Sequence, residues 1–188
     1  KQIIDFCFSK NIECFQGSEI NVMERVFQTA SFFQADVIVE ITGDCPLLDP
    51  EICEHVIKTY ISENKDYVNN NTIRSYPDGM DTRIFSTQTL KKSMSMTSSL
   101  LDQEHVSLHI KNNPEVFSFK NIIAPKELYW PDLGLTLDEE RDYFVIKKII
   151  DALYVSNKIF NCYDIIKYLR LNPEIIDINK EVLRKGDS

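Results

Sequence analysis

The stretch VIVEITGDCPLLDPE, residues 37–51, contains the two signals from which the fold is predicted. Residues 36–42 are almost continuously apolar and rich in β-branched side chains, which is typical of a strand covered by helices on both faces. This strand breaks off at Gly43 and Asp44. Residues 49–51 (Asp-Pro-Glu) then form a helix start, because they combine a capping side chain, a proline at the first helical position and an acid near the positive end of the helix dipole. The stretch therefore predicts a strand, a loop that carries a carboxylate, and a helix.

Strand and helix patterns alternate along the rest of the chain. We expect further strands over residues 12–15, 66–69, 80–85, 116–123 and 133–137. We expect helices over residues 2–10, 87–96, 99–111 and 163–171, and three more that begin after Ser18, Asp49 and Asp138. This alternation predicts an α/β fold: a single three-layer domain over residues 1–188, with a mostly parallel mixed sheet between helix layers. The tail from residue 173 onward carries no readable chemistry, and we expect it to fray.

The composition narrows the classes of partner. A chain of 188 residues with 43% apolar residues can bury one sizeable core. Its formal net charge of −8 argues against a nucleic acid or an anionic membrane as partner. An acidic protein that handles phosphates needs a divalent cation between its carboxylates and theirs. Five cysteines without a CxxC pair predict neither a disulfide framework nor a zinc site, and we expect a cytoplasmic protein.

Two of the expected strands are followed by an aspartate. Residues 36–42 lead to Asp44, and residues 133–137 lead to Asp138. Ligands of open α/β sheets bind beyond the carboxyl ends of the strands, so the two carboxylates converge if their strands are neighbours. Two such charges about 4 Å apart, at an effective dielectric of about 20, repel by roughly 4 kcal/mol, and Mg²⁺ between them would remove that cost. The residues alone leave a structural alternative open, in which Asp138 caps a helix and Asp44 closes a turn.

Four segments carry a resemblance to a known family. They are DVIVEITGDCPLLDPE (36–51), YPDGMDTRIFS (76–86), DQEHVSLHIKNNPEVF (102–117) and LTLDEERDYFVIKKI (135–149). In this order they resemble the cytidylyltransferase family that includes the spore-coat polysaccharide protein F type, which is related to CMP-KDO and acylneuraminate cytidylyltransferases. The resemblance implies a glycosyltransferase-A-like nucleotidyltransferase fold. It also implies an enzyme of surface polysaccharide biosynthesis that joins CTP to an acidic sugar and releases pyrophosphate with Mg²⁺, and a homodimer is a further expectation.

The resemblance also implies roles for individual residues. Asp44 and Asp138 would be the catalytic metal ligands, although residues 137–143 read L-D-E-E-R-D-Y where family members often have V-D-x-P-E-D-L. The nucleotide would be bound by Gly17, Ser18, Arg25 and Gly43. The sugar would be bound by Arg74, Asp78, Gly79, Asp81, Glu104 and His105, with the Arg74 fork on a sugar carboxylate.

Structural interpretations of the same residues stay open beside these roles. Ser18 with Arg25 also fits a capped helix with one surface arginine, and residues 77–79 also fit a plain Pro-Asp-Gly turn. His105 and His109 share the spacing of a zinc site, but two ordinary histidines are the simpler interpretation. Cys45 is rejected as a nucleophile, because an adjacent carboxylate raises the pKa of a thiol.

One expected feature is absent from the sequence. Relatives of this kind begin with a strand and a Gly-rich, Arg- or Lys-containing loop that grips the triphosphate, and no such segment precedes Lys1. We expect this segment to be missing from the chain, and without it the fragment itself is expected to be inactive. Two other functions stay open: a glycosyltransferase of the same fold that consumes a nucleotide-sugar, and a non-catalytic binding or assembly module.

Overall fold

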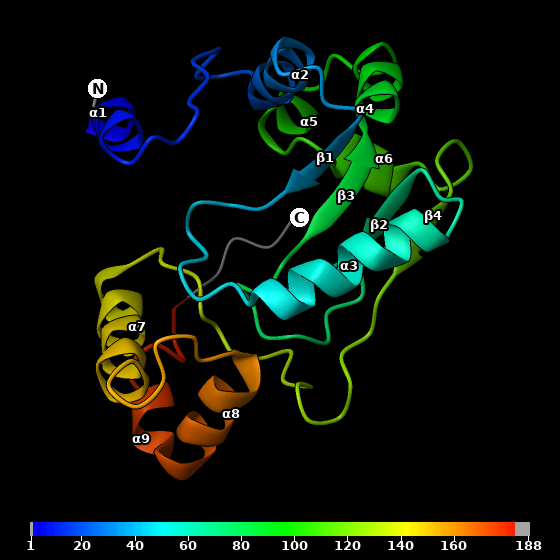
Figure 1. The fold of residues 1–188 in the computed structure, drawn as a ribbon. Coiled ribbons are helices and arrows are strands. Elements are labelled where there is room, and N and C mark those ends of the chain that lie inside the picture. Colours follow the sequence, from blue (N-terminus) through cyan, green and yellow to red (C-terminus); the bar gives the residue numbers. More distant parts are fainter. Residues whose placement is uncertain (1, 183–188) are drawn as a thin grey trace.

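The centre of the fold is a four-stranded sheet in the order β1-β3-β2-β4 (Figure 1), seen in a computed structural model that describes residues 2–182. The strands are β1 (Val37–Glu40), β2 (Tyr67–Asn69), β3 (Arg83–Ser86) and β4 (Phe119–Asn121). β3 is antiparallel to both of its neighbours, whereas β2 and β4 are parallel. Three of the four strands therefore run in one direction, as expected for a mostly parallel mixed sheet. Most of the ladder contacts are nevertheless antiparallel, because β3 lies between β1 and β2.

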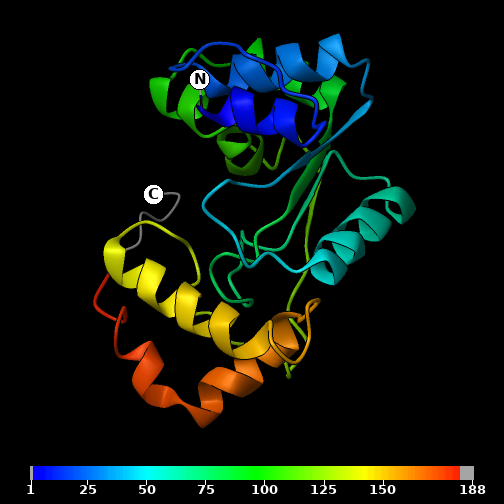
Figure 2. The same ribbon diagram turned by 60° about the vertical axis from the view of Figure 1, so that its left-hand side comes forward.

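Helices cover both faces of this sheet. One core combines the sheet with α3 (Pro50–Ser62), α7 (Glu140–Leu153) and α8 (Cys162–Leu171), and the other combines it with α2 (Val22–Phe32), α4 (Thr87–Met94) and α6 (Leu108–Asn112). Consecutive residues of β2 divide between the two cores, since Val68 belongs to the first and Tyr67 to the second. In Figure 2 the yellow-to-red helices α7, α8 and α9 (Pro173–Ile176) lie below the sheet, and the blue and green helices lie above it. The three-layer arrangement is confirmed.

The helix starts follow the capping signals in the sequence. α3 begins at Pro50, and the Asp49 carboxylate accepts a hydrogen bond from the Glu51 amide at 2.8 Å, as predicted. α2 differs from the prediction, because its cap is Asn21, whose side chain accepts from the Glu24 amide. Ser18 lies one turn earlier, and its hydroxyl accepts from the Asn21 amide at 2.9 Å.

Three of the predicted strands differ from the structure. Residues 12–15 form no strand, since no strand of the described part of the chain forms a ladder with them. Residues 133–137 form a single parallel bridge, between Asp78 and Gly134, in place of a strand. β1 is covered on one face only, because Val37 is 45% exposed and Val39 is 39% exposed. The prediction that helices cover both of its faces is therefore wrong: among the described residues β1 is an edge strand, paired with β3 alone.

The helical predictions also need two corrections. The helix expected over residues 99–111 is two short helices, α5 (Leu100–Glu104) and α6, with His105 between them. The tail was expected to fray, but residues 173–176 form α9, and Asn179 and Val182 are buried. Residues 183–188 lie outside the described part of the chain. α1 (Gln2–Ser9) forms as expected, but none of its residues is buried.

None of the helices within residues 2–182 combines the length and the apolar character needed to span a bilayer.

Candidate active site

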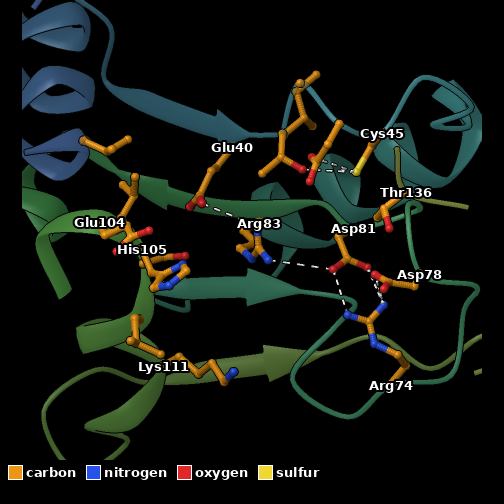
Figure 3. Close-up of a pocket in the computed structure, with 18 of the residues that line it drawn as sticks. Glu40, Cys45, Arg74, Asp78, Asp81, Arg83, Glu104, His105, Lys111 and Thr136 are labelled. Carbon is orange, nitrogen blue, oxygen red and sulfur yellow. Dashed lines mark hydrogen bonds and ion pairs between the residues drawn. The ribbon is translucent and has the colours of Figure 1, made fainter. Parts of the chain in front are cut away.

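A cavity of about 780 Å³ opens beyond the carboxyl end of β1 (Figure 3). Its walls come from the loop after β1, the loop that leads into β3, the α5–α6 region and the segment before α7. Nine predicted site residues line it: Arg25, Gly43, Asp44, Arg74, Asp78, Asp81, Glu104, His105 and Asp138. Gly17, Ser18 and Gly79 do not line it. The structure thus gathers residues from five separate parts of the sequence around one space.

Asp44 and Asp138 lie on the same wall of this cavity. The Leu137 amide donates a hydrogen bond to the Asp44 carbonyl at 2.8 Å, so the two aspartates belong to adjacent backbone segments. The Asp138 carboxylate accepts from the Thr136 hydroxyl at 2.7 Å. The prediction that Asp138 follows a strand is wrong, because no strand lies between β4 and α7. The structural alternative, in which Asp138 caps a helix, is also wrong, because the N-cap of α7 is Glu139.

The segment that leads to Asp138 is extended, although it is not a strand. Asp78 bonds to it twice, since its amide donates to the Leu133 carbonyl and its carbonyl accepts from the Leu135 amide, both at 2.8 Å. Two residues later the hydrogen bond from Leu137 goes to Asp44, on another loop. Each loop offers only one residue to the ladder, so a continuous strand cannot form. The segment instead ties the loop of Asp78 to the loop of Asp44.

Gly79 makes this close approach possible. Its φ of +103° is a conformation that side chains rarely adopt, and a Cβ there would lie 2.9 Å from the backbone carbonyl carbon of Leu135. Gly79 therefore shapes the site without lining the cavity.

The loop between β2 and β3 is closed by buried asparagines. The Asn70 side chain donates to the Met80 carbonyl at 2.7 Å and accepts from the Thr82 amide at 2.8 Å. The Asn71 side chain donates to the Asp81 carboxylate at 3.1 Å. These bonds span the loop and hold Asp81 at the cavity wall.

Asp81 is the centre of an ion-pair network (Figure 3). Arg74 donates to its carboxylate with the two terminal guanidinium nitrogens, at 2.9 and 3.0 Å, and one of them also lies 3.1 Å from the Asp78 carboxylate. The Arg74 fork, which was expected to bind a sugar carboxylate, is thus engaged by Asp81 in this structure. Arg83 adds a further contact to Asp81 at 3.7 Å and one to Glu40 at 3.4 Å.

Glu40, Arg83 and Lys111 line the cavity, and the sequence analysis missed them. Glu40 and Arg83 are register partners on β1 and β3. Because β3 is antiparallel to β1, its first residue lies beside the carboxyl end of β1, where ligands bind. The sequence could have pointed to Arg83 through its position at the start of an expected strand. That inference would have needed the direction of β3, which the sequence does not give.

Arg25 reaches the cavity from α2. Its guanidinium donates to the Ser18 carbonyl and, at 3.5 Å, to the Glu19 carbonyl. A Cβ on Gly17 would lie 2.9 Å from Cγ of Arg25. Gly17 and Ser18 thus hold the Arg25 side chain in place. Of these three residues, only Arg25 lines the cavity.

Cys45 lies beside Asp44, and its thiol is kept neutral. Burial, together with the neighbouring Asp44 charge, raises the pKa of the thiol to about 12, although a hydrogen bond with Thr42 acts in the opposite direction. A thiol with this pKa is protonated at neutral pH, so the rejection of Cys45 as a nucleophile agrees with its surroundings.

The cavity is acidic overall. Seven carboxylates line it, together with three arginines, one lysine and one histidine. Within residues 2–182 no group of three or more His, Cys, Asp or Glu side chains is arranged to hold a metal ion. Mg²⁺ commonly takes only one or two protein carboxylates, with water and phosphate oxygens in its other positions. The pair Asp44 and Asp138 on an open wall fits that donor set.

Three comparisons relate the chain to known proteins. The cytidylyltransferase family model matches residues 2–178. An uncharacterized protein from Methanocaldococcus jannaschii is 31% identical over 98% of this chain and 74% of its own length. The spore coat polysaccharide biosynthesis protein SpsF from Bacillus subtilis is 28% identical over 89% of this chain and 69% of its own. A solved cytidylyltransferase from Leptospira borgpetersenii superposes with a TM-score of 0.86 and 27% identity, over 98% of this chain and 76% of the other.

The three-layer fold and the structural neighbour place the protein among the nucleotidyltransferases. The family model covers almost all of the described residues. The chain belongs to the cytidylyltransferase family.

Proposed function

We propose that the protein joins CTP to an acidic sugar, giving a CMP-sugar and pyrophosphate, with Mg²⁺ held by Asp44 and Asp138. The anomeric hydroxyl forms the new bond to the α-phosphorus, the bond from that phosphorus to the bridging oxygen breaks, and the hydroxyl proton is released. The B. subtilis relative is named for spore coat polysaccharide biosynthesis, which supports a product used in surface polysaccharides.

The observation that carries the proposal is the contact between the two aspartate segments. The 2.8 Å hydrogen bond from Leu137 to the Asp44 carbonyl sets the two residues on one wall of a large open cavity. The remaining carboxylates of that cavity would repel a triphosphate, so a divalent cation is needed for binding as well as for chemistry. When bound, Mg²⁺ supplies charge neutralisation at the phosphate oxygens.

In this proposal the protein residues orient the nucleotide and select the sugar. Arg25 lies against Gly17 and lines the cavity, which supports a contact between its guanidinium and the nucleotide. Arg74, Arg83 and Lys111 line the other walls of the cavity. Asp81 holds both arginines there, so Arg74 would have to exchange Asp81 for the carboxylate of an acidic sugar. A fixed geometry for both substrates supports direct in-line transfer, so no covalent enzyme intermediate is needed.

The test is pyrophosphate release from CTP by the complete gene product, with Mg²⁺ and a panel of sugar acids. We expect Asp44→Ala and Asp138→Ala each to lower kcat/KM by roughly 100-fold or more, because metal charge stabilisation is worth several kcal/mol. Glu140→Ala is the matched control, since this exposed carboxylate begins α7 two residues after Asp138 and does not line the cavity.

Two outcomes would contradict the proposal. Full activity of both aspartate variants would remove the metal role. Release of nucleoside diphosphate from a nucleotide-sugar, with no release of pyrophosphate from CTP, would favour a glycosyltransferase instead.

A further inference from the structure

Asp142 is a fully buried carboxylate in the first turn of α7, with 0% of its surface exposed. One of its oxygens accepts hydrogen bonds from two successive backbone amides, those of Asp138 at 3.2 Å and Glu139 at 2.9 Å. A helix capping box accounts for the bond from Glu139. A capping box does not require the second bond, from the Asp138 amide. This second bond fixes the backbone of Asp138, the proposed metal ligand.

Asn179 holds Asp142 from a distant part of the chain. Its side-chain amide donates to the other oxygen of Asp142 at 2.8 Å and to the Gly134 carbonyl at 3.2 Å. Asn179 is only 4% exposed, and it lies after α9 in the segment expected to fray. One amide group therefore ties down the chain on both sides of Asp138, at Gly134 before it and at Asp142 after it.

We propose that Asp142 and Asn179 are positioning residues that set the divalent-cation affinity of the site by fixing Asp138, an inference that rests on the proposed function. Groups that orient a metal ligand typically change metal affinity or activity by about 10- to 100-fold when they are removed. The Asp138 carboxylate already accepts a hydrogen bond from Thr136, so its direction depends on where this short segment is held. The carboxyl-terminal segment is then part of the active site, although it does not line the cavity.

The test compares Asn179→Ala with Asn172→Ala in the complete gene product. Asn172 is the matched control, because its side-chain amide also donates to a backbone carbonyl, that of Tyr168 at 2.8 Å, but within the end of α8. Mn²⁺ binding is measured directly by electron paramagnetic resonance in the presence of α,β-methylene-CTP. Hydrogen exchange of the Asp138 and Glu139 amides is measured on the same variants without metal.

We expect Asn179→Ala to bind Mn²⁺ about 10-fold more weakly or worse, and to exchange the two amides faster, while Asn172→Ala matches the wild type. Raising Mg²⁺ should restore much of the turnover of Asn179→Ala, which a general loss of structure would not allow. Asp142→Asn, which keeps the side-chain shape, should show the same weakening.

The outcomes separate this inference from the function beneath it. If the wild type binds Mn²⁺ and Asn179→Ala binds it equally well, the positioning role is wrong and the proposed function stands. If the wild type itself binds no Mn²⁺ with the nucleotide, the proposed function fails and the inference fails with it.

Discussion

At the scale of single residues, small and amide side chains shape the site as much as the charged ones do. Gly79 lets its loop meet the backbone of Leu135, and Asn70 closes that loop from inside. Asp81 then holds Arg74 and Arg83 at the cavity wall. The charges are therefore arranged by a loop whose conformation depends on Gly79 and Asn70, which do not line the cavity.

Two glycines of the site should respond differently to substitution by alanine. Gly79→Ala should lower the free energy of unfolding by about 2 kcal/mol or more, because it combines a positive φ with a backbone clash. Gly43→Ala should change it by less than about 1 kcal/mol, since a Cβ there meets nothing within 4 Å. Urea denaturation of both variants measures the difference. Equal stability of the two would contradict the account of the loop.

The buried thiol of Cys162 predicts a pH dependence of stability. Burial, with a smaller contribution from the Asp49 charge, raises its pKa from 9.0 to about 12. Between these values the unfolded chain loses the proton first, so the unfolding free energy should fall as pH rises, by up to about 1.4 kcal/mol per pH unit. Below pH 9 this group adds no slope. The stability difference between wild type and Cys162→Ala should therefore shrink by roughly 1.5 kcal/mol from pH 9 to pH 10.5, and parallel curves would contradict it.

At the scale of elements, one carboxylate joins two helices. Asp49 accepts from the Glu51 amide at the start of α3 and, with its other oxygen, from the Cys162 amide at the start of α8, both at 2.8 Å. These helices are far apart in the sequence but share one core. Asp49 is buried, and its two hydrogen bonds connect the start of α3 to the start of α8.

Removing the Asp49 carboxylate should lower the free energy of unfolding by more than removing an ordinary helix cap. We expect Asp49→Ala to destabilise the protein by about 2–4 kcal/mol, because two helix starts lose their acceptor and buried amides are left unsatisfied. Asn161→Ala is the control, since the Asn161 side chain caps α8 alone, and it should cost about 1 kcal/mol. Chemical denaturation of both variants checks the ratio, and equal losses would mean that the bond to α8 contributes nothing.

Elements with a strong local signal were predictable, and elements that depend on distant partners were not. The start of α3 and the strand β1 follow from residues 36–51, where capping and apolar patterning are local. Residues 133–137 have the apolar pattern of a strand, yet they bond first to the loop of Asp78 and then to the loop of Asp44, which no local pattern records. Asp44 and Asp138 could be predicted as candidate site residues from their positions after apolar runs and from the family resemblance. The position of Asn179 could not be predicted, because it depends on tertiary contacts. That of Arg83 could not be predicted either, because it depends on the direction of β3.

At the scale of the whole molecule, the acidic cavity lies between helix layers that are joined through the sheet. Its carboxylates outnumber its arginines and lysine seven to four. The charge of a triphosphate is unfavourable in such a space until a divalent cation is present. Binding and catalysis are thus both expected to depend on the metal.

Metal removal tests this view of the cavity. With EDTA, the affinity for CTP should fall by about 10-fold or more, because a phosphate approaching the carboxylates loses its bridging cation. Titration calorimetry with and without Mg²⁺ measures the change. CTP binding that is as tight in EDTA as in Mg²⁺ would show that the cations of the protein suffice.

The most direct test of the central claim is a crystal structure of the complete protein with Mn²⁺ and α,β-methylene-CTP, in which anomalous scattering locates the metal. We expect one peak at about 2 Å from a carboxylate oxygen of Asp44 and from one of Asp138, with nucleotide phosphate oxygens in other positions. A peak that touches only one of the two aspartates, or that lies on Asp78 and Asp81 instead, would contradict the account.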